Sequence, residues 1–144
     1  MHHRKLKEIV AGQQLLQVSS KTLVIDVAKR MCDRNVAAVL VIDDGDMVGI
    51  FTERDLLRRV VAHGRDPSKT KITEVMTKHI ATLDGERLGF EAVALMIELN
   101  IRHVAVTGLR DTGYGIVSIR DFVLSELSTF ERELQFEDEV WSSI

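Results

Sequence analysis

One pattern of residues occurs twice in this chain, and it limits the possible folds more than any other feature. The heptad GIFTERD begins at Gly49, and the heptad GIVSIRD begins 66 residues later, at Gly115. Each heptad has a hydroxyl residue at its fourth position and an aspartate three residues further on. Two such heptads in register within 144 residues indicate that one structural unit has been duplicated.

The duplication extends well beyond the heptads. KLKEIV, from Lys5, resembles KITEVM, from Lys71. The segments TLVIDVAKRMCDRN and RLGFEAVALMIELN follow, and their apolar residues recur at i, i+4, i+5 and i+8, as on the buried face of a helix. A β-branched run, a turn with glycine and the heptad come next. Each copy is therefore predicted to fold as strand, helix, strand, strand, helix.

These repeats predict an α/β fold in which two units pack as one pseudo-two-fold module. Pro67 lies in a polar stretch between the copies, where a helix is expected to stop. We therefore expect a first repeat at residues 1–66, a second at 67–128 and a C-terminal helical extension at 129–144. Neither repeat has enough apolar residues to form a large core by itself.

Composition argues against several classes of function. The formal charge of −3 lacks the basic excess of nucleic-acid-binding proteins, and no apolar run is long enough to span a membrane. The first ten residues do not resemble a signal peptide, and the single cysteine cannot form an internal disulfide, so we expect a cytoplasmic protein. Cys32 is expected to pack as a small apolar residue, and the histidine spacing does not predict a metal site.

Two interpretations of the heptads remain open from residue chemistry. Thr52 and Asp55, like Ser118 and Asp121, have the spacing of a capping box at a helix N-terminus. The same N-terminus can bind a phosphate, and the neighbouring carboxylate can accept hydrogen bonds from sugar hydroxyls. Capping is the commoner role for this pattern.

The duplicated unit, with its Gly-x-x-Thr/Ser-x-x-Asp ending, resembles a tandem pair of cystathionine β-synthase (CBS) domains over roughly residues 5–127. The resemblance to small stand-alone members of this family is strongest in IRHVAV and GIVSIRD. It implies a regulatory sensor that binds AMP, ADP, ATP, NAD(H) or S-adenosylmethionine in clefts between the repeats. It implies no catalysis and no required cofactor. The hairpin VAVTGLRDTGYG lacks the usual proline of the family, so its turn is not predicted.

The resemblance also implies two sets of ligand-binding residues, each combining the motif of one repeat with strand residues of the other. One cleft is expected to use Thr52, Asp55, Ala81, Ile101, Arg102 and His103. The other is expected to use Ser118, Asp121, Leu16, Val36 and Ala37. Arg102 and His103 correspond to Ala37 and Ala38, so one predicted cleft has strand residues suited to phosphate and the other does not.

Two other classes of function compete with the sensor. An enzyme is disfavoured because no nucleophile with a base, no metal cluster and no GxxxxGK loop is present. A structural protein-interaction module, whose clefts have degenerated and whose motifs only cap helices, is the main alternative.

The C-terminal segment predicts self-association. Its apolar residues recur at helical spacing, which forms one apolar seam: Val123, Leu127, Phe130, Leu134 and Trp141. We expect this seam to contribute to a homodimer, while the downstream protein partner is unknown. The many acidic residues of the segment disfavour a close parallel pairing of two such helices.

Overall fold

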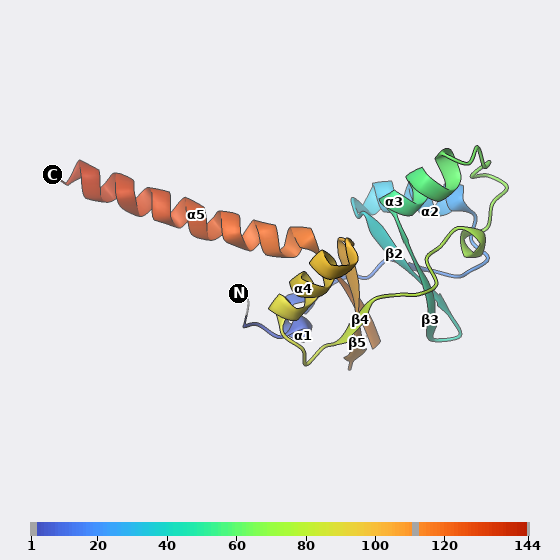
Figure 1. Ribbon diagram of the computed structural model, residues 1–144, viewed down its shortest axis with the longest axis horizontal. Coiled ribbons are helices and arrows are strands. Elements are labelled where there is room, and N and C mark those ends of the chain that lie inside the picture. The colour runs from blue at the N-terminus through green and yellow to red at the C-terminus, as the bar shows by residue number, and fades with distance from the viewer. Residues whose placement is uncertain (1–2, 111–112, 144) are drawn as a thin grey trace. The chain divides into compact units, whose positions relative to one another are not determined.

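The computed structural model describes residues 3–110 and 113–143, with the side chains of residues 124–130 set aside (Figure 1). The chain forms two compact units. We call Gly12–Ala81 the Asp55 unit, and Met1–Ala11 together with Thr82–Ile144 the Asp121 unit, after the motif aspartate that each contains.

The Asp55 unit has the predicted order of strand, helix, strand, strand, helix. Its sheet has the order β1-β2-β3, with β1 parallel and β3 antiparallel to β2. Asp44 and Gly45 join β2 to β3 with φ values of 50° and 82°, which is the positive-φ pair that a tight Asp-Gly hairpin requires. Its elements are β1 (Gln17–Val18), α2 (Val24–Arg34), β2 (Ala38–Asp43), β3 (Asp46–Thr52), α3 (Glu53–Asp55), the π-helix η1 (Leu56–Val61) and the 3₁₀-helix η2 (Ile72–Glu74).

The Asp121 unit repeats this architecture, with sheet order β4-β5-β6. Both long inner helices end on an asparagine in the left-handed conformation, Asn35 after α2 and Asn100 after α4. The turn between β5 and β6 includes residues 111 and 112, which lie outside the described residues. The elements of the unit are α1 (Leu6–Ile9), β4 (Thr82–Asp84), α4 (Gly89–Leu99), β5 (His103–Leu109), β6 (Gly113–Ser118) and α5 (Ile119–Ser142).

Each unit has a small apolar core under its sheet. In the Asp55 unit, α2 buries Val24, Val27 and Met31 against the strands. The expectation that Cys32 packs as a small apolar residue is wrong, because its side chain is exposed. It follows Met31 by one residue, which is a rotation of about 100° on a helix, and therefore points away from the buried face.

Two short segments before the strands complete the units, and each joins the repeat other than its own. In the Asp121 unit, Leu6 N donates to Arg87 O at 2.8 Å and Lys7 N donates to Gly85 O at 2.9 Å. In the Asp55 unit, Ile72 N donates to Thr22 O at 2.8 Å. KLKEIV thus belongs to the unit of the second motif, and KITEVM to the unit of the first. The repeat boundaries 1–66, 67–128 and 129–144 describe the sequence duplication and stay a prediction.

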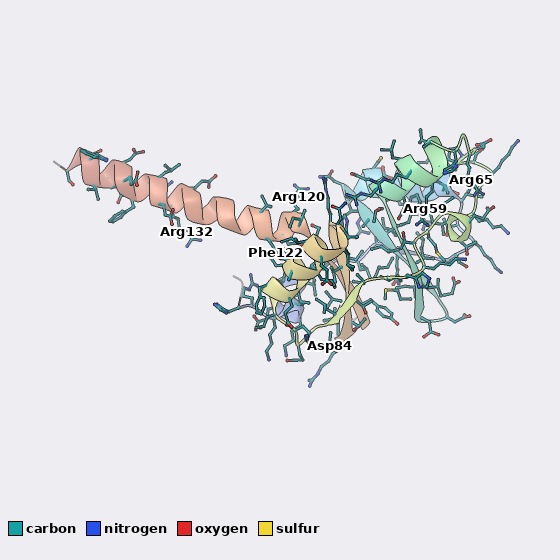
Figure 2. All side chains as sticks on the ribbon, in the orientation of Figure 1. Arg59, Arg65, Asp84, Arg120, Phe122 and Arg132 are labelled. Carbon is teal, nitrogen blue, oxygen red and sulfur yellow. The ribbon has the colours of Figure 1, made fainter. Side chains whose placement is uncertain are left out.

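The helices after the two motifs differ. After Asp55 the chain forms the six-residue π-helix η1, in which Ala62 N donates to Leu57 O at 2.9 Å, and the helix ends before Pro67. After Ser118 the chain forms α5, which runs without a break for 24 residues. Phe122, near its start, packs over Gly89 of α4 (Figure 2).

The second half of α5 extends beyond the strands of its own unit, and residues 131–143 are all exposed (Figure 1). Three members of the predicted seam are exposed, Val123 and Leu134 at 47% and Trp141 at 74%. The side chains of Leu127 and Phe130 lie outside the described residues. Among the described residues, no helix combines the length and the apolar character needed to cross a bilayer.

Candidate ligand site at the two strand-to-helix motifs

The first motif forms a capping box where β3 ends and α3 begins. Asp55 N donates to Thr52 Oγ1 at 3.3 Å, and Thr52 N donates to Asp55 Oδ2 at 3.0 Å. Thr52 Oγ1 also lies 3.2 Å from Asp55 Oδ2. The predicted capping role of these residues is therefore confirmed, and it uses the Oδ2 oxygen of the aspartate.

The other oxygen of Asp55 is held by residues from outside the heptad. Thr77 Oγ1 donates to Asp55 Oδ1 at 3.0 Å, and Arg59 Nε lies 3.5 Å from the same oxygen. Arg59 Nη1 also donates to Met76 O at 3.0 Å. Asp55 is 8% exposed, so its carboxylate is buried among donors that belong to its own unit.

The second motif repeats the cap but not the other contacts. Ser118 N donates to Asp121 Oδ2 at 2.8 Å, and Ser118 Oγ lies 3.5 Å from this oxygen. Among the residues that the structure describes, none donates to Asp121 Oδ1. Asp121 is also more exposed than Asp55. The two aspartates thus have the same local backbone setting and different surroundings.

Within each unit, the start of the motif helix is joined to the second strand segment of the sheet. Glu53 N donates to Ala37 O at 3.0 Å, and Ile119 N donates to Arg102 O at 2.9 Å. Ser118 pairs with His103 across β5 and β6. The Asp121 unit therefore places an exposed arginine and a half-buried histidine beside its own motif, where the Asp55 unit has alanines.

The other predicted site residues lie near the ends of strands. Leu16 and Val36 pack partly buried against the core of the Asp55 unit, and Leu16 O accepts from Leu40 N at 3.2 Å. Ile101 packs against the core of the Asp121 unit, and Ala81 is half-buried at the end of the Asp55 unit. The combination of one unit's motif with the other unit's strand residues stays a prediction from the family resemblance.

Thr77 and Arg59 are contacts of the motif acid that the sequence reasoning missed. A signal for Thr77 exists in the repeat itself, since KITEVMT aligns with KLKEIVA and the threonine takes the place of Ala11. Gly49, the first residue of the heptad, has a related role, because a Cβ there would clash with Met76 Sδ. The first glycine of the motif therefore makes room for the segment that carries Thr77.

The groups at the two junctions are suited to binding a ligand. A strand-to-helix junction with a carboxylate acceptor can bind sugar hydroxyls, and its backbone N–H groups favour an anion. In the part of the chain that the structure describes, no cluster of three or more His, Cys, Asp or Glu side chains could hold a metal ion.

Comparison with known proteins identifies the repeated unit. The pattern described as "CBS domain" matches the chain twice, over residues 6–62 and 72–127. The chain belongs to the CBS domain family. The mitochondrial CBS domain-containing protein CBSX3 of Arabidopsis thaliana is 36% identical over 137 residues, which cover 91% of this chain and 66% of that protein. The chain thus spans about two thirds of the length of this relative.

Solved CBS proteins have the same fold. A protein with CBS domains from Burkholderia ambifaria matches with a TM-score of 0.76 and 31% identity, covering 85% of this chain and 93% of the other. A CBS domain protein from Pyrobaculum aerophilum, solved in complex with AMP, matches with a TM-score of 0.71 and 24% identity, covering 87% and 98%. The predicted α/β fold of two CBS repeats is confirmed.

Proposed function

We propose that this CBS pair is a non-catalytic sensor that binds an adenine nucleotide, AMP first among the candidates, through its motif aspartates. The observation that carries the proposal is that both motifs are intact at strand-to-helix junctions, and that one carboxylate oxygen of Asp121 has no donor among the described residues. The AMP complex of the Pyrobaculum aerophilum protein of the same fold supports this ligand class. A cytoplasmic location agrees with the sequence.

A ligand panel tests the proposal. AMP, ADP, ATP, NAD(H) and S-adenosylmethionine are compared by thermal shift, since a ligand of the native state raises the melting temperature. Any ligand that binds is then incubated with the protein and assayed for turnover. Stabilisation without product supports the sensor, and product formation supports an enzyme. A flat panel favours the alternative, a structural interaction module whose motifs only cap helices.

Calorimetry with motif variants tests the role of the aspartates. Asp55→Ala and Asp121→Ala should each weaken AMP, and the loss at the stronger site should be about 1.5 to 3 kcal/mol because a charged hydrogen-bond acceptor is removed. A folded double variant that binds AMP as the wild type does would refute the ribose assignment.

The exposed guanidinium of Arg102 is proposed to bind the ligand phosphate, because an arginine presents paired donors to phosphate oxygens. Arg102→Ala should therefore weaken AMP more than adenosine. Arg132→Ala, at an exposed arginine of α5, is the matched control and should change neither affinity (Figure 2). Equal losses for AMP and adenosine in the Arg102 variant would exclude phosphate recognition.

We also propose that the chain forms a homodimer to which the C-terminal part of α5 contributes. The supporting observation is the exposure of Val123, Leu134 and Trp141 on one helix face. Truncation after Leu127 and Leu134→Glu should both weaken self-association in sedimentation experiments. Phe136→Ala, at an exposed residue away from this face, is the control. A full-length monomer at micromolar concentration, or a truncated chain that associates as tightly, would refute the proposal.

A further inference from the structure

The carboxylate of Asp55 has contacts on both of its oxygens. An ionised carboxylate offers about four lone-pair sites, two on each oxygen. Oδ2 receives the backbone N–H of Thr52 and faces the hydroxyl of the same residue. Oδ1 receives the hydroxyl of Thr77 and lies beside the guanidinium of Arg59. A sugar hydroxyl therefore has to compete, on either oxygen, with a group that already contacts Asp55.

Among the described residues, Asp121 has fewer hydrogen-bond donors on its carboxylate than Asp55 has. Its Oδ2 oxygen serves the helix cap as in the first motif, while none of the described residues donates to its Oδ1 oxygen. One source of the difference lies outside the heptads, since Thr77 aligns with Ala11, which has no hydroxyl. The two motifs are thus alike in sequence and differ in the contacts that the described residues make with their acid.

We propose that Thr77 is a positioning residue that gates the first motif, so that Asp121 accepts a ribose hydroxyl directly while Asp55 must first give up its bond to Thr77. This inference rests on the proposed nucleotide-binding function and adds an order of filling to it. Thr77 matters more than Arg59 in the gate, because Thr77 donates a hydrogen bond of 3.0 Å whereas Arg59 forms only an ion pair at 3.5 Å from a half-exposed side chain.

The gate also links the first motif to the segment that precedes β4. Thr77 pairs with Ile50 of β3 through both backbone groups, at 2.8 and 2.9 Å, and Met76 occupies the space left by Gly49. Arg59 ties the carbonyl of Met76 to the motif acid. When Asp55 accepts a hydrogen bond from a ligand in place of Thr77, residues 76 and 77 lose one of their contacts with the motif. Occupancy of the first motif therefore changes how this segment is held in its unit.

The test isolates the first motif by working in full-length Asp121→Ala protein, with AMP as the probe and calorimetry as the readout. Thr77→Val removes the hydroxyl with little change of volume and should tighten AMP binding about tenfold, since AMP no longer competes with a hydrogen bond to a charged group. Thr77→Ser keeps the hydroxyl and is the matched control, with the affinity of the Asp121→Ala parent. The melting temperature of ligand-free Thr77→Val should fall, because Asp55 loses a donor.

The outcomes separate the gate from the function. A lower melting temperature together with tighter AMP binding supports the gate. If Thr77 were only structural, its loss would lower both the melting temperature and the affinity for AMP. If AMP binds the wild type and depends on Asp121, but Thr77→Val binds no tighter than Thr77→Ser, the gate is refuted and the sensor stands. If neither the wild type nor any variant binds AMP or adenosine, the proposed function fails and the gate fails with it.

Discussion

The Asp55 unit and the Asp121 unit have the same architecture, yet their motif aspartates have different contacts. Both have a three-stranded sheet, an inner helix that ends on a left-handed asparagine, and a Thr or Ser that caps the helix after the last strand. Asp55 has donors on both oxygens and Asp121 on one, as far as the described residues show. The two repeats thus share the backbone and the cap, while residues outside the heptad determine which groups contact the acid.

A second difference lies in the helices that follow the motifs. η1 widens to i→i+5 bonds and ends after six residues, whereas α5 continues for 24 residues and exposes apolar side chains. A π-helix is an unusual conformation and often marks a functional position. Here it carries Arg59, which contacts both Asp55 and Met76. The two units therefore differ both in the contacts of the motif acid and in the helix that follows it.

The largest predicted effect concerns a feature that both units share, a short segment from the other repeat that buries an apolar side chain in the core. Leu6 of α1 and Ile72 of η2 are both fully buried in the unit that they complete. Leu6→Ala and Ile72→Ala should each lower the free energy of unfolding by about 2 to 5 kcal/mol, as large-to-small changes in a core do. Denaturant titration measures both. Leu57→Ala, at an exposed residue, is the control and should cost less than about 1 kcal/mol.

A clear inequality between the two core variants would break the structural equivalence of the units. If Leu6→Ala cost no more than the exposed control, α1 would not be an integral part of the Asp121 unit. The same reasoning applies to η2 in the Asp55 unit.

The next effect sharpens the comparison at the acids. Asp55→Ala should lower the free energy of unfolding by about 2 to 3 kcal/mol, because it leaves the Thr52 amide and the Thr77 hydroxyl without their buried acceptor. Asp121→Ala should cost about 1 kcal/mol, the usual loss of a helix cap. Thermal and denaturant unfolding of ligand-free protein measure both. Equal costs would mean that the additional donors on Asp55 contribute nothing to stability.

The order of the elements could be predicted because both signals for it, the apolar periodicity and the repeated heptads, can be read directly from the amino-acid sequence. The exchange of Leu6 and Ile72 between repeats was not predicted, because a short apolar segment does not specify which of two similar surfaces it covers. The exposure of Cys32 was missed because the apolar face of α2 is narrower than its sequence suggests. The π-helix after Asp55 has no sequence signal, since its residues also suit an α-helix.

In the candidate site too, some contacts could be predicted from the sequence and others could not. The caps at Thr52 and Ser118 follow from local spacing, and the sequence was sufficient to predict them. The hydrogen bond from Thr77 and the ion pair of Arg59 to Asp55 depend on where η2 and η1 lie in space, which local spacing does not specify. The predicted combination of strand residues from the opposite repeat remains a prediction.

The smallest predicted effect concerns pH and the attachment of α1. Hydrogen bonds from Lys5 at 2.8 Å and from Lys7 at 2.6 Å lower the pKa of Glu86 from 4.5 to about 2. In the Asp55 unit, the backbone N–H of Lys71 lowers the pKa of Glu74, which also pairs with Arg65 at 2.7 Å. Each unit thus has a glutamate whose pKa is lowered at the segment that comes from the other repeat, Glu86 beside α1 and Glu74 in η2.

Because the pKa of Glu86 is lower in the folded state, its contribution to stability is fully present above its unfolded value of 4.5 and is lost as pH falls through about 2. The protection of the Leu6 and Lys7 amides against hydrogen exchange should therefore decrease within this window, and by a modest amount because exposed ion pairs are weak. Glu86→Gln should start with lower protection at pH 6 and lose less of it on acidification. If the variant and the wild type showed the same pH dependence, the bonds from Lys5 and Lys7 would not hold α1 to its unit, and burial of Leu6 would remain as its attachment.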